Sequence, residues 1–166
     1  MVKTVACKVD EMKDGEMRQI DIGDGGHALL VRENGAYTAV GHKCTHYGAP
    51  LIKGSLMNGR VRCPWHGACF NVHTGDIEDF PGLDSIPKFE TKIVDGSVVV
   101  YANPEDLKSH KKVAKMCQAH PSKDKRTFLL IGGGPASLEC AETLRKNEFK
   151  GKIVIATAED VLPYDR

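Results

Sequence analysis

Two short segments, each with one cysteine and one histidine, constrain this chain more than any other feature of its sequence. The first is Cys44-Thr45-His46, and the second, sixteen residues later, is Cys63-Pro64-Trp65-His66. Thiolate and neutral imidazole are ligands that soft and borderline metal ions prefer in proteins. A glycine follows each segment, at Gly48 and Gly67, which is typical of tight loops. The pattern predicts that two loops meet around a metal centre.

The division of the ligands favours a [2Fe–2S] cluster over a structural zinc ion. A Rieske centre holds one iron by two cysteines and the other by two histidines, so each segment would supply one ligand to each iron. Zinc sites of the Cys₂His₂ type usually place two cysteines together and two histidines together. Structural zinc on the same side chains is the alternative. The predicted ligands are Cys44, His46, Cys63 and His66.

Three hairpin signals in the first hundred residues predict a fold made mainly of β-strands. Asn34-Gly35, Asn58-Gly59 and Asp95-Gly96 each separate two short apolar or alternating stretches, and such dipeptides favour two-residue hairpin turns. Further strands are expected at Val5–Val9 and Met17–Ile22. Closely spaced hairpins with little helical periodicity indicate an antiparallel sandwich or barrel.

The composition gives no support to a nucleic-acid or membrane partner. The chain has 23 basic and 22 acidic residues, a net charge of +1, so it lacks the excess positive charge that such surfaces attract. No apolar run approaches the ~20 residues that span a bilayer, and the first ten residues do not resemble a secretion signal. Six cysteines in this setting are more often metal ligands or buried thiols than disulfides. We therefore expect a cytoplasmic location.

The character of the sequence changes after residue 103. A short helical turn is expected at Pro104–Leu107, and residues 108–126 carry seven Lys or Arg residues and one acid, Asp124. We interpret residues 104–125 as a basic, solvated linker between domains; a nucleic-acid-binding arm is the alternative.

A second motif follows the linker. Thr127–Ile131 is an apolar strand, Gly132-Gly133-Gly134 is a tight turn, Pro135 to about Asn147 is a helix, and Lys152–Thr157 is a second strand. In this setting a G-x-G-x-x-G pattern indicates dinucleotide binding, and Ser137 replaces the last glycine by another small residue. The helix N-terminus would receive the pyrophosphate, and Glu159 would bind a ribose hydroxyl. The predicted cofactor-binding residues are Gly132, Gly134, Ser137 and Glu159.

Residues 3–102 resemble Rieske domains. The resemblance rests on the two ligand segments, each followed by glycine and alanine in the pattern shown here, and on Phe80-Pro81-Gly82-Leu83, which looks like the third loop that covers the cluster in that family. The resemblance implies an antiparallel β sandwich with the cluster in a rubredoxin-like subdomain.

The sequence departs from the high-potential Rieske proteins of respiratory complexes at three positions. Ala49 and Trp65 stand where that branch has two cysteines joined in a disulfide, and Ala68 stands where it has a serine that bonds a bridging sulfide. Hydrogen bonds to the sulfurs raise the potential of an iron–sulfur cluster. We therefore predict a low-potential centre, near the bottom of the Rieske range of roughly −150 to +300 mV.

Residues 132–142, together with Leu162-Pro163-Tyr164-Asp165-Arg166, resemble pyridine-nucleotide-dependent flavoprotein reductases. With the Rieske segment, the whole chain is similar to apoptosis-inducing-factor-like proteins, which join a Rieske domain to an FAD- and NAD(P)H-binding oxidoreductase. The implied domains are a Rieske domain at 1–103, a linker at 104–125 and an incomplete β-α-β unit of a Rossmann-like FAD domain at 126–166.

The resemblance implies electron transfer between a flavin and the cluster, as the N-terminal part of an FAD-dependent NAD(P)H oxidoreductase. A stand-alone Rieske ferredoxin that serves a separate oxygenase or reductase is the alternative function. Because 41 residues rarely fold alone, FAD is expected only in a complete protein and not in this chain. The partner is then a flavin domain or another redox protein.

The remaining cysteines and histidines show no ligand pattern. Cys7 and Cys69 are expected to be buried thiols, Cys117 to be exposed, His42 to lie on a loop, and Trp65 to pack against the domain.

Overall fold

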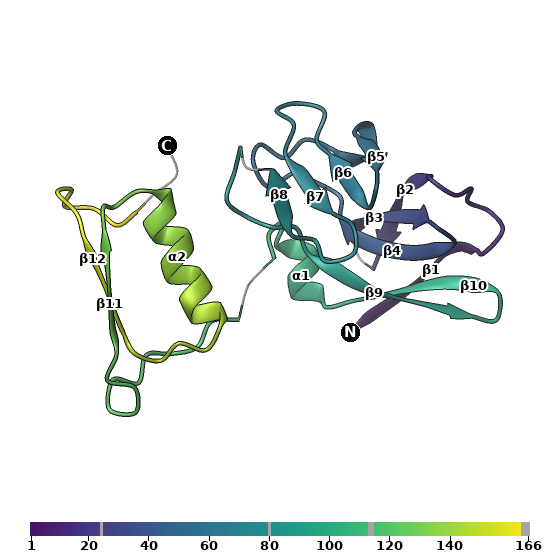
Figure 1. Cartoon of the computed structure of the whole chain (residues 1–166). Coiled ribbons are helices and arrows are strands. Elements are labelled where there is room, and N and C mark those ends of the chain that lie inside the picture. The colour runs from purple at the N-terminus through teal and green to yellow at the C-terminus, as the bar shows by residue number, and fades with distance from the viewer. Residues whose placement is uncertain (24, 80, 113–114, 164–166) are drawn as a thin grey trace. The chain divides into compact units, whose positions relative to one another are not determined.

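The computed structural model describes residues 1–23, 25–79, 81–112 and 115–163, and Figure 1 shows their elements. They form two compact units, residues 1–113 and 114–166. No helix of the described residues is long and apolar enough to cross a membrane.

A six-stranded antiparallel sheet is the larger part of the first unit (Figure 1). Its strand order is β1-β10-β9-β4-β3-β2. The predicted strands are confirmed, although the first begins three residues earlier than the sequence indicates. The strands are β1 (Val2–Lys8), β2 (Met17–Ile22), β3 (Gly26–Glu33), β4 (Ala36–Gly41), β9 (Lys88–Val94) and β10 (Ser97–Ala102).

The three predicted hairpin turns are all present, and their backbone explains the residues that form them. Asn34 and Gly35 have φ of 51° and 74°, and the same pair of positive values recurs at Asn58-Gly59 and Asp95-Gly96. A two-residue turn of this type needs positive φ at both positions, which Asn, Asp and Gly tolerate best. These turns set the register of β3 on β4, of β5 (Ser55–Met57) on β6 (Arg60–Arg62), and of β9 on β10.

Strand β3 supplies side chains to two separate hydrophobic cores. Leu29 and Val31 belong to the core shared with the smaller sheet. Ala28 and Leu30 belong to a core formed within the six-stranded sheet. Because successive strand residues face opposite sides, a strand covered on both sides has a continuous apolar run, as residues 28–31 do.

A smaller four-stranded antiparallel sheet carries the predicted metal site. Its order is β5-β6-β7-β8, and a 3₁₀ turn, η1 (Leu51–Lys53), precedes it. Its core includes Leu51, Val61, Phe70 and Ile86, all fully buried. The sequence did not predict the last two strands, because three-residue strands show little alternation. The strands are β5 (Ser55–Met57), β6 (Arg60–Arg62), β7 (Cys69–Asn71) and β8 (Ile77–Asp79).

The segment expected to be a solvated linker is mostly exposed to solvent, but it is attached to both units at several points. Helix α1 (Pro104–Lys108) is capped by Asn103, and its Leu107 packs against the core within the six-stranded sheet. Further on, the Lys112 backbone N–H donates to the Ser85 carbonyl (2.8 Å). Residues 104–112 therefore belong to the first unit, and the division between the units falls at residue 113 rather than at 103 and 125.

The second unit has the expected β-α-β order. Strands β11 (Thr127–Ile131) and β12 (Lys152–Ala156) are parallel, and helix α2 (Pro135–Lys146) connects them. Residues 115–126 pack here: the Cys117 N–H donates to the Arg145 carbonyl, and the His120 N–H to the Lys150 carbonyl. Cys117, expected to be exposed, is half-buried, with its sulfur 3.2 Å from the Phe149 carbonyl oxygen.

Candidate metal centre

The first ligand segment is a tight loop that leaves the six-stranded sheet after β4. The Cys44 N–H donates to the Ala49 carbonyl (2.9 Å), and the Gly48 N–H donates back to the Cys44 carbonyl (2.9 Å). Gly48 has φ of 74°, a conformation that costs a residue with a side chain more. A bridge between Lys43 and Pro50 closes the loop. This ligand loop therefore connects the six-stranded sheet to the smaller sheet and is not the tip of a regular hairpin.

The second ligand segment joins β6 to β7 and repeats the same backbone pattern. The Cys63 N–H donates to the Ala68 carbonyl (2.8 Å), and the Gly67 N–H donates to the Cys63 carbonyl (3.2 Å). Gly67 has φ of 76°. Each loop thus spans six residues from cysteine to alanine, with its glycine in the fifth place, and the two loops present their ligands in a related way.

The two predicted cysteine ligands lie together in the interior. Cys44 is 3% exposed and Cys63 is 4% exposed. Burial raises the pKa of the Cys44 thiol and the Cys63 sulfur raises it further, whereas the backbone N–H groups of His46 and Tyr47 lower it by donating to the Cys44 sulfur. A bound cation would replace the thiol protons and stabilise the thiolates.

The two predicted histidine ligands also form a pair. The ring centroids of His46 and His66 are 5.0 Å apart and the rings are nearly perpendicular. His46 Nδ1 is buried and has no hydrogen-bond partner, although a buried polar atom without a partner costs about 1–3 kcal/mol. A metal ion on this nitrogen would remove that cost, so the residues present fit the predicted group.

The candidate ligands form two pairs rather than one group of four. Within the described ranges, no group of three or more His, Cys, Asp or Glu side chains lies close enough to hold one ion. One pair consists of thiols and the other of imidazoles, which is the division that a [2Fe–2S] cluster of the Rieske type requires.

Neighbouring residues contact the histidine pair, in which His46 is half-buried and His66 is exposed. The Tyr47 ring lies 4.2 Å from the His46 ring and 5.5 Å from the His66 ring, centroid to centroid. A Cβ atom on Gly82 would lie 3.5 Å from the Cβ of His46, so the predicted third loop does approach a ligand. Phe80, which begins that loop in the sequence motif, lies outside the described residues. The Thr45 hydroxyl donates to the Asp84 carbonyl (2.5 Å) and ties the first ligand loop to the third.

His42 lies on the loop after β4, as expected, but its side chain is buried. It is 7% exposed, and its Nδ1 lies 3.0 Å from the His27 carbonyl oxygen. Burial, together with the neighbouring His27 and Lys43, lowers the pKa of His42 to about 4. The ring is therefore neutral at neutral pH and serves the packing beneath the first ligand loop.

The three positions that depart from the high-potential branch, Ala49, Trp65 and Ala68, differ in their burial. Ala49 and Ala68 are fully buried beside the ligand loops, and all six cysteines are free thiols. Cys7 and Cys69 are buried as predicted. Trp65 is not packed as expected, because 57% of its surface is exposed.

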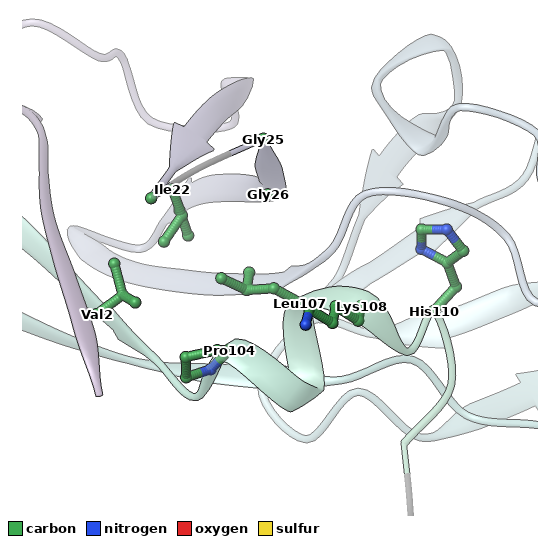
Figure 2. A pocket seen from close by; sticks show the side chains of 9 residues that line it. Val2, Ile22, Gly25, Gly26, Pro104, Leu107, Lys108 and His110 are labelled. Carbon is green, nitrogen blue, oxygen red and sulfur yellow. The ribbon is translucent and has the colours of Figure 1, made fainter.

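One cavity of the first unit lies apart from this centre. It measures about 570 Å³ and lies between the start of β1, the turn after β2 and helix α1, with Val2, Ile22 and Leu107 on its walls (Figure 2). None of its lining residues belongs to a ligand loop.

Comparison with known proteins identifies the family. The family profile described as the Rieske [2Fe-2S] domain matches residues 2–90, more than half of the chain. The chain belongs to the Rieske [2Fe–2S] domain family. Its resident cofactor is the Rieske [2Fe–2S] cluster, and its mainly β fold is the fold of that family, which confirms both predictions.

The curated relatives of this chain are of two kinds, apoptosis-inducing factors and ferredoxins. The chain is 48% identical to apoptosis-inducing factor 3 of Mus musculus and of Homo sapiens, over 99% of this chain and 28% of theirs. It is 30% identical to ferredoxin CarAc of Metapseudomonas resinovorans, over 57% of this chain and 88% of that ferredoxin. The chain therefore spans a little more than a quarter of the length of its apoptosis-inducing-factor relatives.

Solved structures confirm the Rieske fold. A structure described as the ferredoxin of Sphingomonas yanoikuyae B1 matches with a TM-score of 0.57 and 28% identity, over 61% of this chain and 99% of that one. A chain from a complex of reduced oxygenase and oxidized ferredoxin in carbazole 1,9a-dioxygenase matches with the same score and identity, over 59% of this chain.

The predicted dinucleotide-binding residues lie together in the second unit. Gly132 has φ of 105°, and Gly134 is the N-cap of α2. Ser137 lies in the first turn of that helix, and its N–H donates to the Gly134 carbonyl (3.1 Å). Glu159 is exposed in the turn after β12, where its N–H donates to the Thr157 hydroxyl. The end of the flavoprotein motif, residues 164–166, lies outside the described residues.

Sequence reasoning missed two residues that contact the ligand loops. Tyr47 touches both histidine rings, and the Arg62 guanidinium donates to the Gly67 carbonyl (2.8 Å). Both lie directly beside a predicted ligand in the sequence, and that adjacency is the signal that could have indicated them.

Proposed function

We propose that Cys44 and Cys63 hold one iron of the cluster, that His46 and His66 hold the other, and that the chain transfers single electrons. The observation that carries the proposal is the partnerless, buried Nδ1 of His46 beside the His66 ring. A cluster held by these side chains would take up and release one electron at a time. The buried thiols keep water from the cysteine side of the site, whereas His66 on the histidine side is exposed to solvent.

We propose a low potential for this centre. At Ala68 there is no hydroxyl to donate to a bridging sulfide, and the cysteines are free. Both features remove interactions that raise the potential of other Rieske proteins, since hydrogen bonds to the sulfurs stabilise the reduced, more negative cluster.

We propose that the electron partner is a flavin bound by a domain that begins at residue 126. Support comes from the strand–glycine–helix unit of β11 and α2, whose Gly132, Gly134 and Ser137 would bind the FAD pyrophosphate. The 48% identity to apoptosis-inducing factor 3 and the resemblance to flavoprotein reductases support it further. In such a protein the first unit would divide the two electrons of a reduced flavin into single transfers, with NADH or NADPH as the original donor.

The second candidate is a stand-alone ferredoxin for a separate oxygenase or reductase. The observation that favours it is the match of residues in the first unit to nearly the whole length of ferredoxin CarAc and of the Sphingomonas ferredoxin. It leaves the second unit without a role. Electron transfer to a flavin domain within one polypeptide, compared with transfer to an added oxygenase, separates the two candidates.

The exposed aromatic residues of the ligand loops support docking of a redox partner at the histidine side. Tyr47 is 68% exposed and Trp65 is 57% exposed, and such residues are enriched where proteins bind one another. We propose a reducing, cytoplasmic location, because six cysteines in a chain with this ligand pattern are more often metal ligands or buried thiols than disulfides.

A matched pair of cysteine substitutions tests the proposal. We expect Cys44→Ser to abolish cluster binding, because the serine hydroxyl is a poor ligand for iron in this setting. Cys69→Ser changes another buried cysteine of the same subdomain and is expected to keep the cluster. Iron and acid-labile sulfide per chain, followed by a redox titration, provide the readout. Equal iron and sulfide in both variants would refute the ligand assignment, and a clearly positive potential would refute the low-potential assignment.

A further inference from the structure

Arg62 holds a fixed position beside the second ligand loop. It is the last residue of β6 and directly precedes Cys63. One guanidinium nitrogen donates to the Gly67 carbonyl (2.8 Å), and the other donates to the Asp79 carboxylate on β8. Gly67 directly follows His66, so the guanidinium contacts the C-terminal part of the loop that carries both a cysteine and a histidine ligand.

The two acceptors restrict the guanidinium although the side chain is about half exposed. Arginine presents several donors in a rigid fork, so one acceptor on the ligand loop and one on β8 together determine where its charge lies. An exposed ion pair alone contributes little to the stability of the fold. The fixed position of the Arg62 charge therefore matters more here than any contribution of the ion pair to stability.

The charge of Arg62 reaches one buried sulfur atom of this subdomain, that of Cys69. Burial raises the pKa of the Cys69 thiol, the Arg62 guanidinium and, less strongly, the Arg60 guanidinium oppose that rise, and the Asp79 and Glu78 carboxylates add to it. Cys69 pairs with Arg62 across β6 and β7, and with Asp79 across β7 and β8. The cation therefore favours negative charge on this side of the ligand loop, and the anion partly cancels it.

We infer that Arg62 is a positioning residue of the cluster, which holds the second ligand loop through Gly67 and raises the reduction potential, and that Asp79 limits this rise. The inference rests on the proposed function, because reduction adds one negative charge at the site. A nearby fixed cation lowers the free energy of the more negative, reduced form.

The chain contains a matched control on the same strand. Arg60 also lies on β6 and also pairs with an acid of β8, Glu78. Its side chain is 50% exposed, against 51% for Arg62. Arg60 lies two residues farther from Cys63, and its backbone acceptor is the Asn58 carbonyl in the β5–β6 turn. Substitution of either arginine removes one positive charge, but only Arg62 contacts the ligand loop.

The test is a spectroelectrochemical titration of the whole chain and four variants, with iron and sulfide measured in each. We expect Arg62→Gln to lower the equilibrium constant for one-electron reduction about three- to tenfold, or roughly 30–60 mV at about 59 mV per tenfold. Arg62→Lys keeps the charge and should stay within about twofold of the wild type. Arg60→Gln should also stay within about twofold, and Asp79→Asn should raise the constant.

Several results would overturn the inference. If Arg62→Gln has the same reduction potential as Arg60→Gln, the charge of Arg62 does not set the potential. The same conclusion follows if Arg62→Lys lowers the reduction potential as much as Arg62→Gln does. If Arg62→Gln fails to hold iron, the reduction potential of Asp79→Asn becomes the deciding measurement. An unchanged or lower potential in Asp79→Asn then refutes the inference. A wild-type chain without iron and sulfide would refute the proposed function as well, whereas a normal wild-type titration with unchanged variants refutes only the role of Arg62.

Discussion

At the scale of single residues, the spacing of Cys and His predicted the four candidate ligands, but the contacts around them needed the structure. The ligand set follows from chemistry, since few arrangements divide two thiols and two imidazoles between neighbouring loops. The contact of Tyr47 with both histidine rings and that of Arg62 with Gly67 depend on how the two loops pack together. Exposed aromatic and charged side chains leave no periodic signal that would predict such contacts.

A hydroxyl restored beside the cluster should raise its potential. Ala68 is fully buried, and its carbonyl accepts from the Cys63 N–H. We expect Ala68→Ser to raise the potential by roughly 60 mV, since one hydrogen bond worth about 1.4 kcal/mol more in the reduced state changes a one-electron equilibrium tenfold.

The measurement is a redox titration of the variant beside the wild type. Ala36→Ser, at an exposed position at the start of β4, adds the same group far from the ligand loops and should leave the potential unchanged. An unchanged or lowered potential in Ala68→Ser would show that this position does not explain the low potential.

At the scale of elements, turn chemistry was the part of the fold that sequence predicted best. Asn-Gly and Asp-Gly pairs favour the positive φ values that two-residue hairpins require, and all three turns formed. The short strands β7 and β8 were missed because three residues are too few for a periodic pattern. The linker is mostly exposed to solvent as expected, but its attachment to the first unit was missed, because basic residues such as Lys112 can form ion pairs on a surface while they face solvent.

One partly buried carboxylate, that of Glu33, connects the end of β3 in the large sheet to a turn of the small sheet. A Glu33 oxygen accepts from the Gly59 N–H (2.9 Å), and its other oxygen lies 3.9 Å from His73 Nε2. We expect Glu33→Ala to lower the free energy of unfolding of the first unit by about 1–3 kcal/mol, because it leaves the Gly59 N–H without this acceptor.

Urea unfolding followed by circular dichroism measures this effect. Glu90→Ala is the control, because Glu90 lies on β9 with half of its side chain exposed and pairs with Lys92. Its substitution should change the free energy of unfolding by less than about 0.5 kcal/mol. If the two substitutions cost the same, the Glu33 contact does not join the sheets.

At the scale of the whole molecule, the chain joins the Rieske fold to a second unit with a strand–helix–strand order. In the second unit, Leu129 is 59% exposed and Ile131 is 84% exposed, both on β11. Parallel strands are normally covered on both faces, so these exposed apolar side chains support our proposal that this unit is part of a larger flavin-binding domain. The glycine motif predicted the β-α-β order because strand, turn and helix are all local in sequence.

We expect the chain to bind FAD weakly or not at all, because two strands and one helix supply only part of a flavin site. Calorimetric titration with FAD, together with the visible spectrum of the purified protein, measures this directly. Flavin bound at one equivalent per chain would contradict the prediction, and would show that residues 126–166 form a complete site.

The central claim is that Cys44, His46, Cys63 and His66 hold a Rieske cluster that accepts one electron. Electron paramagnetic resonance of the dithionite-reduced chain, with iron and sulfide analysis of the same sample, tests it most directly. We expect equal amounts of iron and acid-labile sulfide, and a spin-½ signal with couplings to the nitrogens of two histidines. Zinc without acid-labile sulfide, or a signal without nitrogen couplings, would contradict it.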